Sequence, residues 1–114
     1  MSQGKKNDAE KVPMDLLSHE ALVEIAKVFG FGAKKYARHN YRGGIAYSRL
    51  VAAAYRHLGA FNSGEDVDPE SGLPHVAHLG CCVVMLLDML REHPELDDRY
   101  KPTKEIPENT SGAV

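Results

Sequence analysis

The sequence predicts an all-α protein: a small bundle of about three main helices per chain, completed by oligomerisation. Apolar residues recur at helical spacing in two segments, residues 19–29 and 48–62. The middle of a third segment, residues 74–91, is apolar all round, which is typical of a helix buried on every side. Because two helices do not easily surround a third, we expect a second copy of the chain to cover it, in a dimer or a tetramer.

The length and charge of the chain limit how many domains it can form and which partners it can bind. Its 114 residues fit one domain. We expect a disordered amino-terminal arm over residues 1–13, a helical domain over residues 14–93 and an extended or disordered tail over residues 94–114, because both end segments are polar. The net charge of -2, with both signs interspersed, argues against binding to duplex nucleic acid.

Two further features indicate a cytoplasmic protein without a membrane partner. The longest apolar run, residues 79–87, is shorter than the roughly 20 residues of a membrane span, and no apolar run follows the amino-terminal lysines as it would in a signal peptide. Cys81 and Cys82 are adjacent within a predicted helix and cannot form a useful disulfide with each other. We therefore expect buried, reduced thiols.

The first predicted helix follows Ser18, a plausible N-cap, and carries two acids on the face opposite its apolar stripe. Glu20 and Glu24 are one turn apart, where like charges repel in an isolated helix. A metal ion between them removes that cost, and so does Lys27 beside them. The pattern therefore fits either a metal site or an ordinary solvated face.

The next segment, residues 33–42, interleaves cations with aromatic rings. Lysine and arginine bind phosphate, and tyrosine rings can stack on a base. The alternative is a helix carboxyl terminus decorated with cations, which the helix dipole favours. Ser48 can cap the second predicted helix, in which Arg49 and Arg56 share an alanine-lined face. This pair also fits two interpretations. They could meet an anion or pair with acids at a helix contact.

Residues 56–78 concentrate the chemistry of the chain. Four acids lie in a turn-forming loop, and three histidines lie on the predicted helices either side of it: Glu65, Asp66, Asp68, Glu70, His57, His75 and His78. Aspartate, glutamate and histidine together are ligands for divalent metals. A structural turn capped by Asp68 before Pro69, and ended by Gly72, explains part of the loop. A structural zinc site of the three histidines and one acid is a further alternative.

Asp88 interrupts the apolar run of the third helix, roughly opposite His75. A buried aspartate needs a partner, such as an arginine of the second helix or of another subunit.

Several segments, taken in order, carry a resemblance to a known family: M-D-L-L-S-H-E-A-L, F-G-A-K-K-Y-A-R-H-N-Y-R, R-H-L and G-E-D-V-D-P-E-S-G-L-P-H-V-A-H. Over about residues 14–92 the chain resembles a phage family of dATP/dGTP diphosphohydrolases, also described as MazZ-like. These are remote relatives, in role at least, of the MazG-type all-α NTP pyrophosphohydrolases. The resemblance implies a helical oligomer that hydrolyses a purine deoxynucleoside triphosphate to the monophosphate and pyrophosphate with Mg²⁺ or Mn²⁺.

The chain departs from the MazG pattern, which places E-E-x-x-E on one helix and E-x-x-D on the next. Here the first helix offers only Glu20 and Glu24, spaced by four, and the Glu65-x-x-Asp68 pair lies in a predicted loop. The metal ligands therefore cannot be carried over directly from the MazG-type enzymes.

In-line attack of a metal-activated water on a phosphoryl group needs metal ligands, a group that orients or deprotonates water, and cations for the phosphates. The expected metal ligands are Glu20, Glu24, Glu65 and Asp68, with Asp66, Glu70 and His75 in reserve. The expected catalytic residues are Glu24, Glu70 and His75. The expected substrate contacts are Lys34, Lys35, Tyr36, Asn40, Tyr41, Arg42, Arg49, Arg56, His57 and His78. The alternative function is a phage protein that binds and sequesters a nucleotide without catalysis, in which these acids need no metal.

Overall fold

The computed structural model of the chain describes residues 4–102, which contain three α-helices and three short 3-10 helices. Their bounds are η1 Met14–Leu16, α1 His19–Lys35, η2 Asn40–Gly43, α2 Tyr47–Asn62, α3 His75–Glu92 and η3 Pro94–Leu96. In this part of the chain no strand forms, and one isolated bridge pairs Val67 with Pro74. The prediction of a small all-α bundle is confirmed. None of the described helices is long and apolar enough to cross a membrane.

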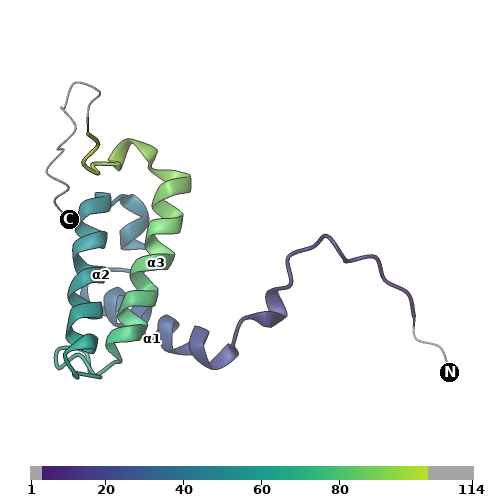
Figure 1. Cartoon of the computed structure of the whole chain (residues 1–114), viewed down its shortest axis with the longest axis horizontal. Helices are drawn as coiled ribbons and strands as arrows, with labels where there is room; N and C mark the ends of the chain where they lie inside the picture. Colours follow the sequence, from purple (N-terminus) through teal and green to yellow (C-terminus); the bar gives the residue numbers. More distant parts are fainter. Residues whose placement is uncertain (1–3, 103–114) are drawn as a thin grey trace, which may run out of the picture.

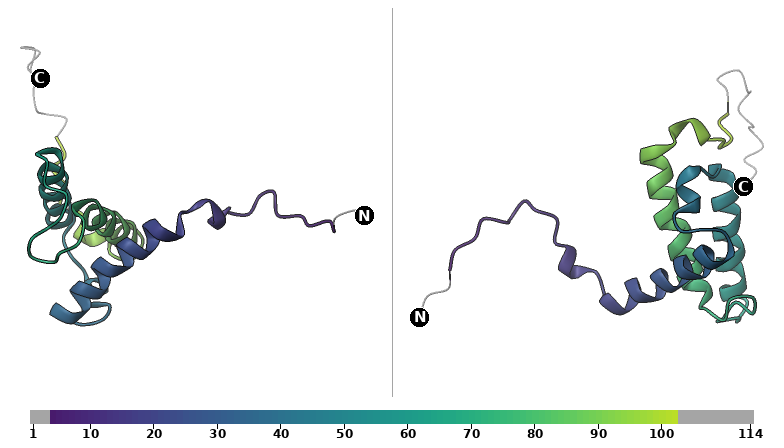
Figure 2. Two further views of the ribbon diagram at one scale, coloured as in Figure 1. Left: turned by 90° about the horizontal axis from the view of Figure 1, so that it is seen from below. Right: turned by 180° about the vertical axis from the view of Figure 1, so that it is seen from behind.

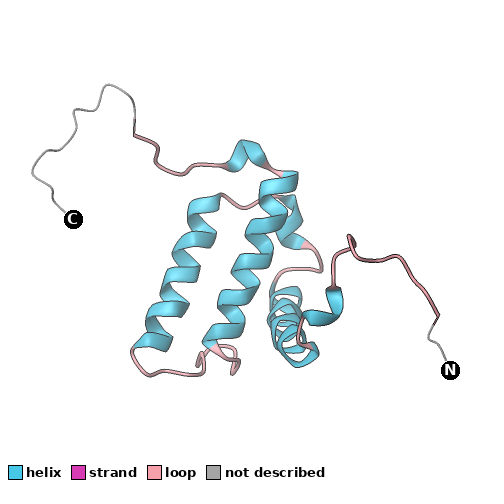
Figure 3. Ribbon diagram, turned by 45° about the vertical axis from the view of Figure 1, so that its right-hand side comes forward, coloured by secondary structure: helices cyan, strands magenta, loops and turns pink. Residues whose placement is uncertain are grey.

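The helices form a pair crossed by a third (Figures 1 and 2). Helices α2 and α3 run antiparallel and side by side, joined at one end by the loop of residues 63–74, while α1 crosses α3 at a steep angle (Figure 3). Residues 4–18 extend away from the bundle and are exposed. The α2–α3 loop is thus held at one end of the bundle by two packed helices.

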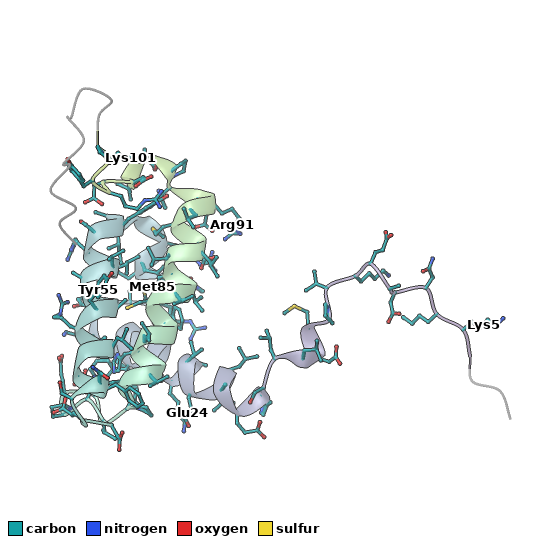
Figure 4. The ribbon with its side chains drawn as sticks, viewed as in Figure 1. Lys5, Glu24, Tyr55, Met85, Arg91 and Lys101 are labelled. Atoms are coloured by element: carbon teal, nitrogen blue, oxygen red, sulfur yellow. The ribbon has the colours of Figure 1, made fainter. Side chains whose placement is uncertain are left out.

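Two clusters of buried side chains hold these elements together. Val28 of α1 packs on Ala77 and Cys81 of α3, and Tyr47 and Leu50 of α2 pack on Met89 of α3. Met85 contacts both clusters and lies between α2 and α3 in Figure 4. Burial at this contact raises the pKa of the Cys81 thiol to about 12, as expected for a structural, unreactive cysteine.

Helix α1 is longer than the sequence pattern predicts. It continues from residue 29 to Lys35 through Gly30 and Gly32, and a Cβ at either glycine would meet nothing within 4 Å. The close helix contact lies instead at Gly80 of α3, where a Cβ would come 2.8 Å from Cδ1 of Ile25. A glycine at residue 80 therefore lets α1 approach α3, which the sequence pattern around residues 30–32 did not reveal.

The second helix also begins differently from the prediction. Its N-cap is Ala46, which makes no side-chain capping bond, and the Ser48 hydroxyl donates to the Asp98 carboxylate instead. The Ser48 N–H donates to the same carboxylate at 2.9 Å, and Leu96 packs against the Tyr47 cluster. The packed part of the chain therefore extends beyond residue 93. Of the predicted arm and tail, residues 1–3 and 103–114 lie outside the described residues.

In the single chain α3 is not covered on every side. Val83, Leu87 and Leu90 are 48%, 62% and 53% exposed, and Leu22 on the projecting half of α1 is 45% exposed. These are the surfaces that the expected second copy would cover, and oligomerisation remains a prediction.

Candidate active site

The α2–α3 loop and the helix ends beside it bring together an acid–histidine centre of five residues: His57, Glu65, Asp68, His75 and His78. His57 lies in the second half of α2, Glu65 and Asp68 lie in the loop, and the other two histidines lie in the first turn of α3. His75 is 5% exposed, although it is a polar residue. Its buried position is possible because both ring nitrogens have partners.

The loop reaches this position through a tight turn centred on Asp68. The Asp68 Oδ1 accepts the Glu70 N–H at 2.8 Å, and the Asp68 carbonyl accepts the Gly72 N–H at 2.8 Å. Gly72 has a φ of 72°, which favours glycine. The predicted Asp68–Gly72 turn therefore forms. Because the turn uses only Oδ1, it leaves Oδ2 of Asp68 facing the histidines.

His75 is held between an acid and another histidine. Its Nε2 lies 2.6 Å from Oε1 of Glu65, and its Nδ1 lies 2.9 Å from Nδ1 of His57. An ionised carboxylate only accepts hydrogen bonds, so Nε2 of His75 carries the ring proton and its N–H donates a hydrogen bond to Glu65. In neutral His75 this leaves a lone pair on Nδ1, which is directed into the centre.

The Asp68 Oδ2 lies 3.9 Å from Nδ1 of His57 and 3.8 Å from Nε2 of His78. These distances are longer than hydrogen bonds. The ligand-capable atoms of these three residues all lie within 4.8 Å of one another, and no other such group of three or more His, Cys, Asp or Glu residues occurs within residues 4–102. The His57 and His78 rings are stacked, with centroids 4.4 Å apart and an interplanar angle of 10°.

Burial keeps this histidine pair neutral. Desolvation lowers the pKa of both His57 and His78 below the ordinary value of 6.5, and the positive charge that His78 would carry lowers the pKa of His57 further. The nearby Asp68 carboxylate opposes the shift without reversing it. At neutral pH each ring therefore has one nitrogen lone pair, which is the form that binds a metal ion or a proton.

A second feature is a cleft of about 580 Å³ between the second half of α1, the segment that follows it, and α3. Small residues of α1, including Gly30, Gly32 and Ala33, line part of the cleft and occupy little of its space. Its lining residues that can contact a nucleotide are Phe29, Tyr36, Arg38, His39, Asn40, Tyr41, Arg42 and Asp88. The cleft therefore combines aromatic rings, an amide, cations and one acid.

Asp88 in this cleft has partners other than the arginine expected from the second helix or another subunit. The Tyr41 hydroxyl donates to Oδ2 of Asp88 at 2.6 Å, and Arg91 of the same helix donates to Oδ1 at 2.9 Å. Burial, with the Asp88 carboxylate as the next cause, raises the pKa of Tyr41. A tyrosine near residue 40 is not a partner that charge pairing along the sequence would suggest.

The structure separates the expected metal ligands. Glu65 and Asp68 both belong to the acid–histidine centre, but each faces different histidine atoms. Glu20 accepts from the Ser18 hydroxyl at 3.2 Å, and Glu24 pairs with Lys27 at 3.1 Å. Glu24 is 43% exposed and points away from α1 into solvent (Figure 4). Neither of these two glutamates joins a group of three ligand-capable residues in the described structure.

The remaining expected catalytic and reserve residues lie at the edge of the loop. Glu70 is 65% exposed and pairs with Lys35 at 3.0 Å. The main-chain carbonyl of Asp66 accepts the N–H of His75 at 2.9 Å, which anchors the start of α3. Glu70 therefore links the loop to the end of α1, beside the centre rather than within it.

The expected substrate contacts divide between the two features. Tyr36, Asn40, Tyr41 and Arg42 line the cleft, and His57 and His78 belong to the acid–histidine centre. Arg56 is exposed, and its charge acts on His57. The expected contacts that are exposed and lie outside the cleft lining are Lys34, Lys35 and Arg49.

Sequence patterns missed two contacts of the centre. The Ser71 hydroxyl lies 2.7 Å from Nε2 of His78, and the edge of the Phe31 ring faces His78 with centroids 6.4 Å apart. Ser71 looked like an ordinary turn residue, and because it lies in the loop before α3, helical periodicity does not relate it to His78. Phe31 lies between two glycines and gave no periodic signal.

Comparison with known proteins places these features in a family. The family model described as "dATP/dGTP diphosphohydrolase, N-terminal" matches residues 1–99. A protein of Salmonella phage PMBT28 called dATP/dGTP diphosphohydrolase is 34% identical over 96 residues, which are 84% of this chain and 33% of the relative. The chain thus spans about a third of that relative's length. No solved structure matches the chain.

Proposed function

Because the chain belongs to the dATP/dGTP diphosphohydrolase N-terminal family, we propose that it hydrolyses a purine deoxynucleoside triphosphate to the monophosphate and pyrophosphate, with a divalent cation. The observation that carries the proposal is the convergence of His57, Asp68 and His78, backed by the His75–Glu65 pair. Metal-capable and proton-accepting groups are what the hydrolysis of a phosphoanhydride requires.

The reaction consumes one water and releases one proton. The water oxygen forms a bond to the α-phosphorus, the bond from that phosphorus to the bridging oxygen of the leaving pyrophosphate breaks, and a base takes the proton. Glu65 suits this role because its side chain is 53% exposed and its carboxylate is oriented by the N–H of His75. A divalent cation held by His57, Asp68 and His78 would offset the negative charge of the phosphates.

The cleft supplies the means to select a nucleoside. Tyr36 and Tyr41 offer ring faces for a base, Asn40 offers an amide that can pair with adenine, and Arg38 and Arg42 offer charge for phosphate. The Lys35–Glu70 ion pair and the Phe31–His78 contact join the end of α1 to the centre, so α1 borders both features. We assign base recognition to the cleft and the reaction to the centre.

A comparison of three variants tests the proposal. The purified chain is incubated with each dNTP and NTP, with and without Mg²⁺ or Mn²⁺, and the products are separated. Asp68→Asn, which keeps size and turn-forming capacity, should lower turnover by at least about 100-fold if it removes a metal ligand. Asp66→Asn, a neighbouring loop acid, is the matched control and should retain turnover. Glu24→Gln tests whether α1 carries a metal ligand, as expected from the sequence. Loss of turnover in this variant would place the metal site on α1 and not in the acid–histidine centre.

The second candidate is nucleotide binding without catalysis, which the cleft supports because its lining needs no metal. Intact nucleotides in every reaction, together with tight binding that Tyr36→Ala weakens and chelator leaves unchanged, would favour it over hydrolysis. Metal-dependent release of monophosphate and pyrophosphate would exclude it.

A further inference from the structure

We propose that the acid–histidine centre is a site for one transition-metal ion of the zinc class, Zn²⁺ or Co²⁺, and discriminates against Mg²⁺. The inference deepens the proposed function by naming the metal of the same centre, and it concerns binding by this chain without nucleotide. It rests on three observations: the kind of donor atoms, their separations and the support behind one of them.

The donor atoms favour nitrogen-binding metals. The centre offers imidazole nitrogens from His57, His75 and His78 and one free carboxylate oxygen from Asp68. Imidazole suits zinc, copper, iron and nickel, whereas Mg²⁺ takes oxygen ligands and keeps much of its water. A magnesium site would place several acids together, yet Glu70 is turned to Lys35 and Glu65 to His75.

The separations fit a four-coordinate ion. Bonds of about 2.0–2.2 Å in a tetrahedral arrangement place any two ligand atoms about 3.4 Å apart. The measured separations are 2.9 Å between the Nδ1 atoms of His57 and His75, and 3.8 and 3.9 Å from Asp68 Oδ2 to His78 and His57. These values bracket the tetrahedral one. The ligand atoms of His57, Asp68 and His78 all lie within 4.8 Å of one another, whereas His75 lies outside this group and would complete the site by moving toward the ion from beside His57.

The hydrogen bond from His75 to Glu65 has the form of an outer partner of a metal-binding histidine. Such histidines donate the nitrogen that faces away from the metal to a carboxylate, which fixes the tautomer and directs the other lone pair inward. His75 donates Nε2–H to Glu65 and turns Nδ1 toward His57. The partner at this inner nitrogen is itself a residue that can bind a metal, so both rings can turn a lone pair toward one ion.

Binding then has a defined proton balance. In the structure one of the facing Nδ1 atoms of His57 and His75 must carry a proton, since two lone pairs would repel at 2.9 Å. An ion bound to both Nδ1 atoms requires this proton of neutral His57 to move to Nε2 of the same ring, so binding at neutral pH should release no net proton. Binding should weaken at acidic pH, where protons compete for the imidazole nitrogens. The Ser71 hydroxyl, which now lies against Nε2 of His78, would have to turn away.

The test uses the whole chain, stripped with chelator and dialysed. Titration with Co²⁺ should give the intense visible absorption of a four-coordinate ion, reach one ion per chain, and be reversed by one equivalent of Zn²⁺ but not by excess Mg²⁺. His78→Gln and Asp68→Asn should each weaken Co²⁺ binding at least about 10-fold. His19→Gln, which changes an exposed histidine on α1, is the control and should bind like the unaltered chain.

A variant at a half-exposed residue tests the proposal even if the variants at buried residues fail to fold. Glu65→Gln leaves the buried rings in place, should retain the helical circular dichroism of the unaltered chain, and should weaken Co²⁺ binding about 10- to 100-fold by loosening His75. Unchanged affinity in folded His78→Gln and Glu65→Gln, or displacement of Co²⁺ by Mg²⁺, would overturn the proposal. Four-coordinate binding without hydrolysis would reject the proposed function alone, and hydrolysis with Mg²⁺ in the absence of such binding would reject this inference alone.

Discussion

The two ends of α3 differ in whether their aspartate is fully paired. At its end, Asp88, Glu92 and His93 are tied by hydrogen bonds of 2.6–3.0 Å to Tyr41, Arg91, Arg42 and Glu95. At its start, His75 and His78 also have partners at 2.6–2.9 Å, but the Asp68 carboxylate differs. Its Oδ2 lies 3.8 and 3.9 Å from His78 and His57, which is too far for hydrogen bonds. Groups with fixed partners hold a structure together, whereas donor groups that face a shared point at these separations can accept a ligand.

The histidines at the two ends also differ in their ionisation. Burial lowers the pKa of His57 and His78, whereas hydrogen bonds to the Arg42 carbonyl and the Glu95 carboxylate raise the pKa of His93. The same residue type is therefore kept neutral by burial in one place and favoured in its charged form by an acid in another. Helix position alone, which is what a sequence pattern shows, does not distinguish the two.

The largest expected effect on stability comes from the hydrophobic core near the end of α3. Met89 is fully buried, and Met89→Ala should lower the free energy of unfolding by about 2–5 kcal/mol, measured by urea denaturation. Leu16→Ala, on the extended arm and 79% exposed, is the control and should cost much less. Metal binding should survive Met89→Ala under folding conditions; its loss would show that the two ends are not independent.

A smaller loss is expected from one hydroxyl at the same end. The buried Tyr47 hydroxyl donates to the carbonyls of Met89 and His93. Tyr47→Phe leaves these carbonyls without that donor and should cost about 1–3 kcal/mol in thermal or urea unfolding. Tyr55→Phe, on a ring that is 72% exposed, should leave stability unchanged. Equal effects of the two variants would contradict the claim that the hydrogen bonds of the Tyr47 hydroxyl stabilise the fold.

The histidines at the two ends of α3 should change stability in opposite directions as pH changes. Unfolding returns His57 and His78 to the ordinary pKa of 6.5, so the unfolded chain binds more protons as pH falls through that value. Their contribution is fully present above pH 6.5 and is lost below it. His93, whose pKa is raised, contributes below its ordinary pKa, and that contribution is lost as pH rises through its folded value.

Urea unfolding across this pH range measures the two contributions. Without added metal, replacing His57 and His78 by glutamine should flatten the fall in stability on the acidic side. His93→Gln should steepen the fall, because it removes the contribution that opposes it. A fall that is unchanged in all three variants would show that other groups set the acid stability.

The smallest effect should come from the ion pair at the loop. Lys35 and Glu70 are 49% and 65% exposed, so solvent screens their attraction even though the pair raises the pKa of Lys35. A double-mutant cycle of Lys35→Ala and Glu70→Ala should give a coupling energy within the error of zero and leave Co²⁺ affinity unchanged. A large coupling would mean that this pair, and not the packing of α1 on α3, positions the loop.

The sequence predicted the fold class well and the site only in part, for physical reasons. Periodic apolar residues define helices locally, so three helices and the Asp68 turn could be placed from nearby residues. The length of α1 was missed because a glycine pair weakens a helix only slightly when packing at Val28 and Ile25 holds it. The histidines were singled out by their density in residues 56–78, a signal that does not depend on the fold.

The pairing of the site residues could not be predicted because it depends on how helices cross. The expectation that Glu20 and Glu24 face the loop acids needs α1 to present that side to α3, whereas α1 presents Ile25 and Val28. Likewise, Tyr41 meets Asp88 only because the chain after α1 turns back along α3. Sequence spacing records neither the crossing nor the turn.

The arm of residues 4–18 has a consequence for how large the protein looks in solution. The radius of gyration of the chain is 19.3 Å, against roughly 13 Å for a compact chain of this length. A sizing column separates by hydrodynamic volume, so a lone chain in this conformation would elute ahead of compact proteins of equal mass and imitate a dimer. Light scattering, which weighs particles irrespective of shape, is therefore the measurement that can decide between one chain and the expected dimer or tetramer.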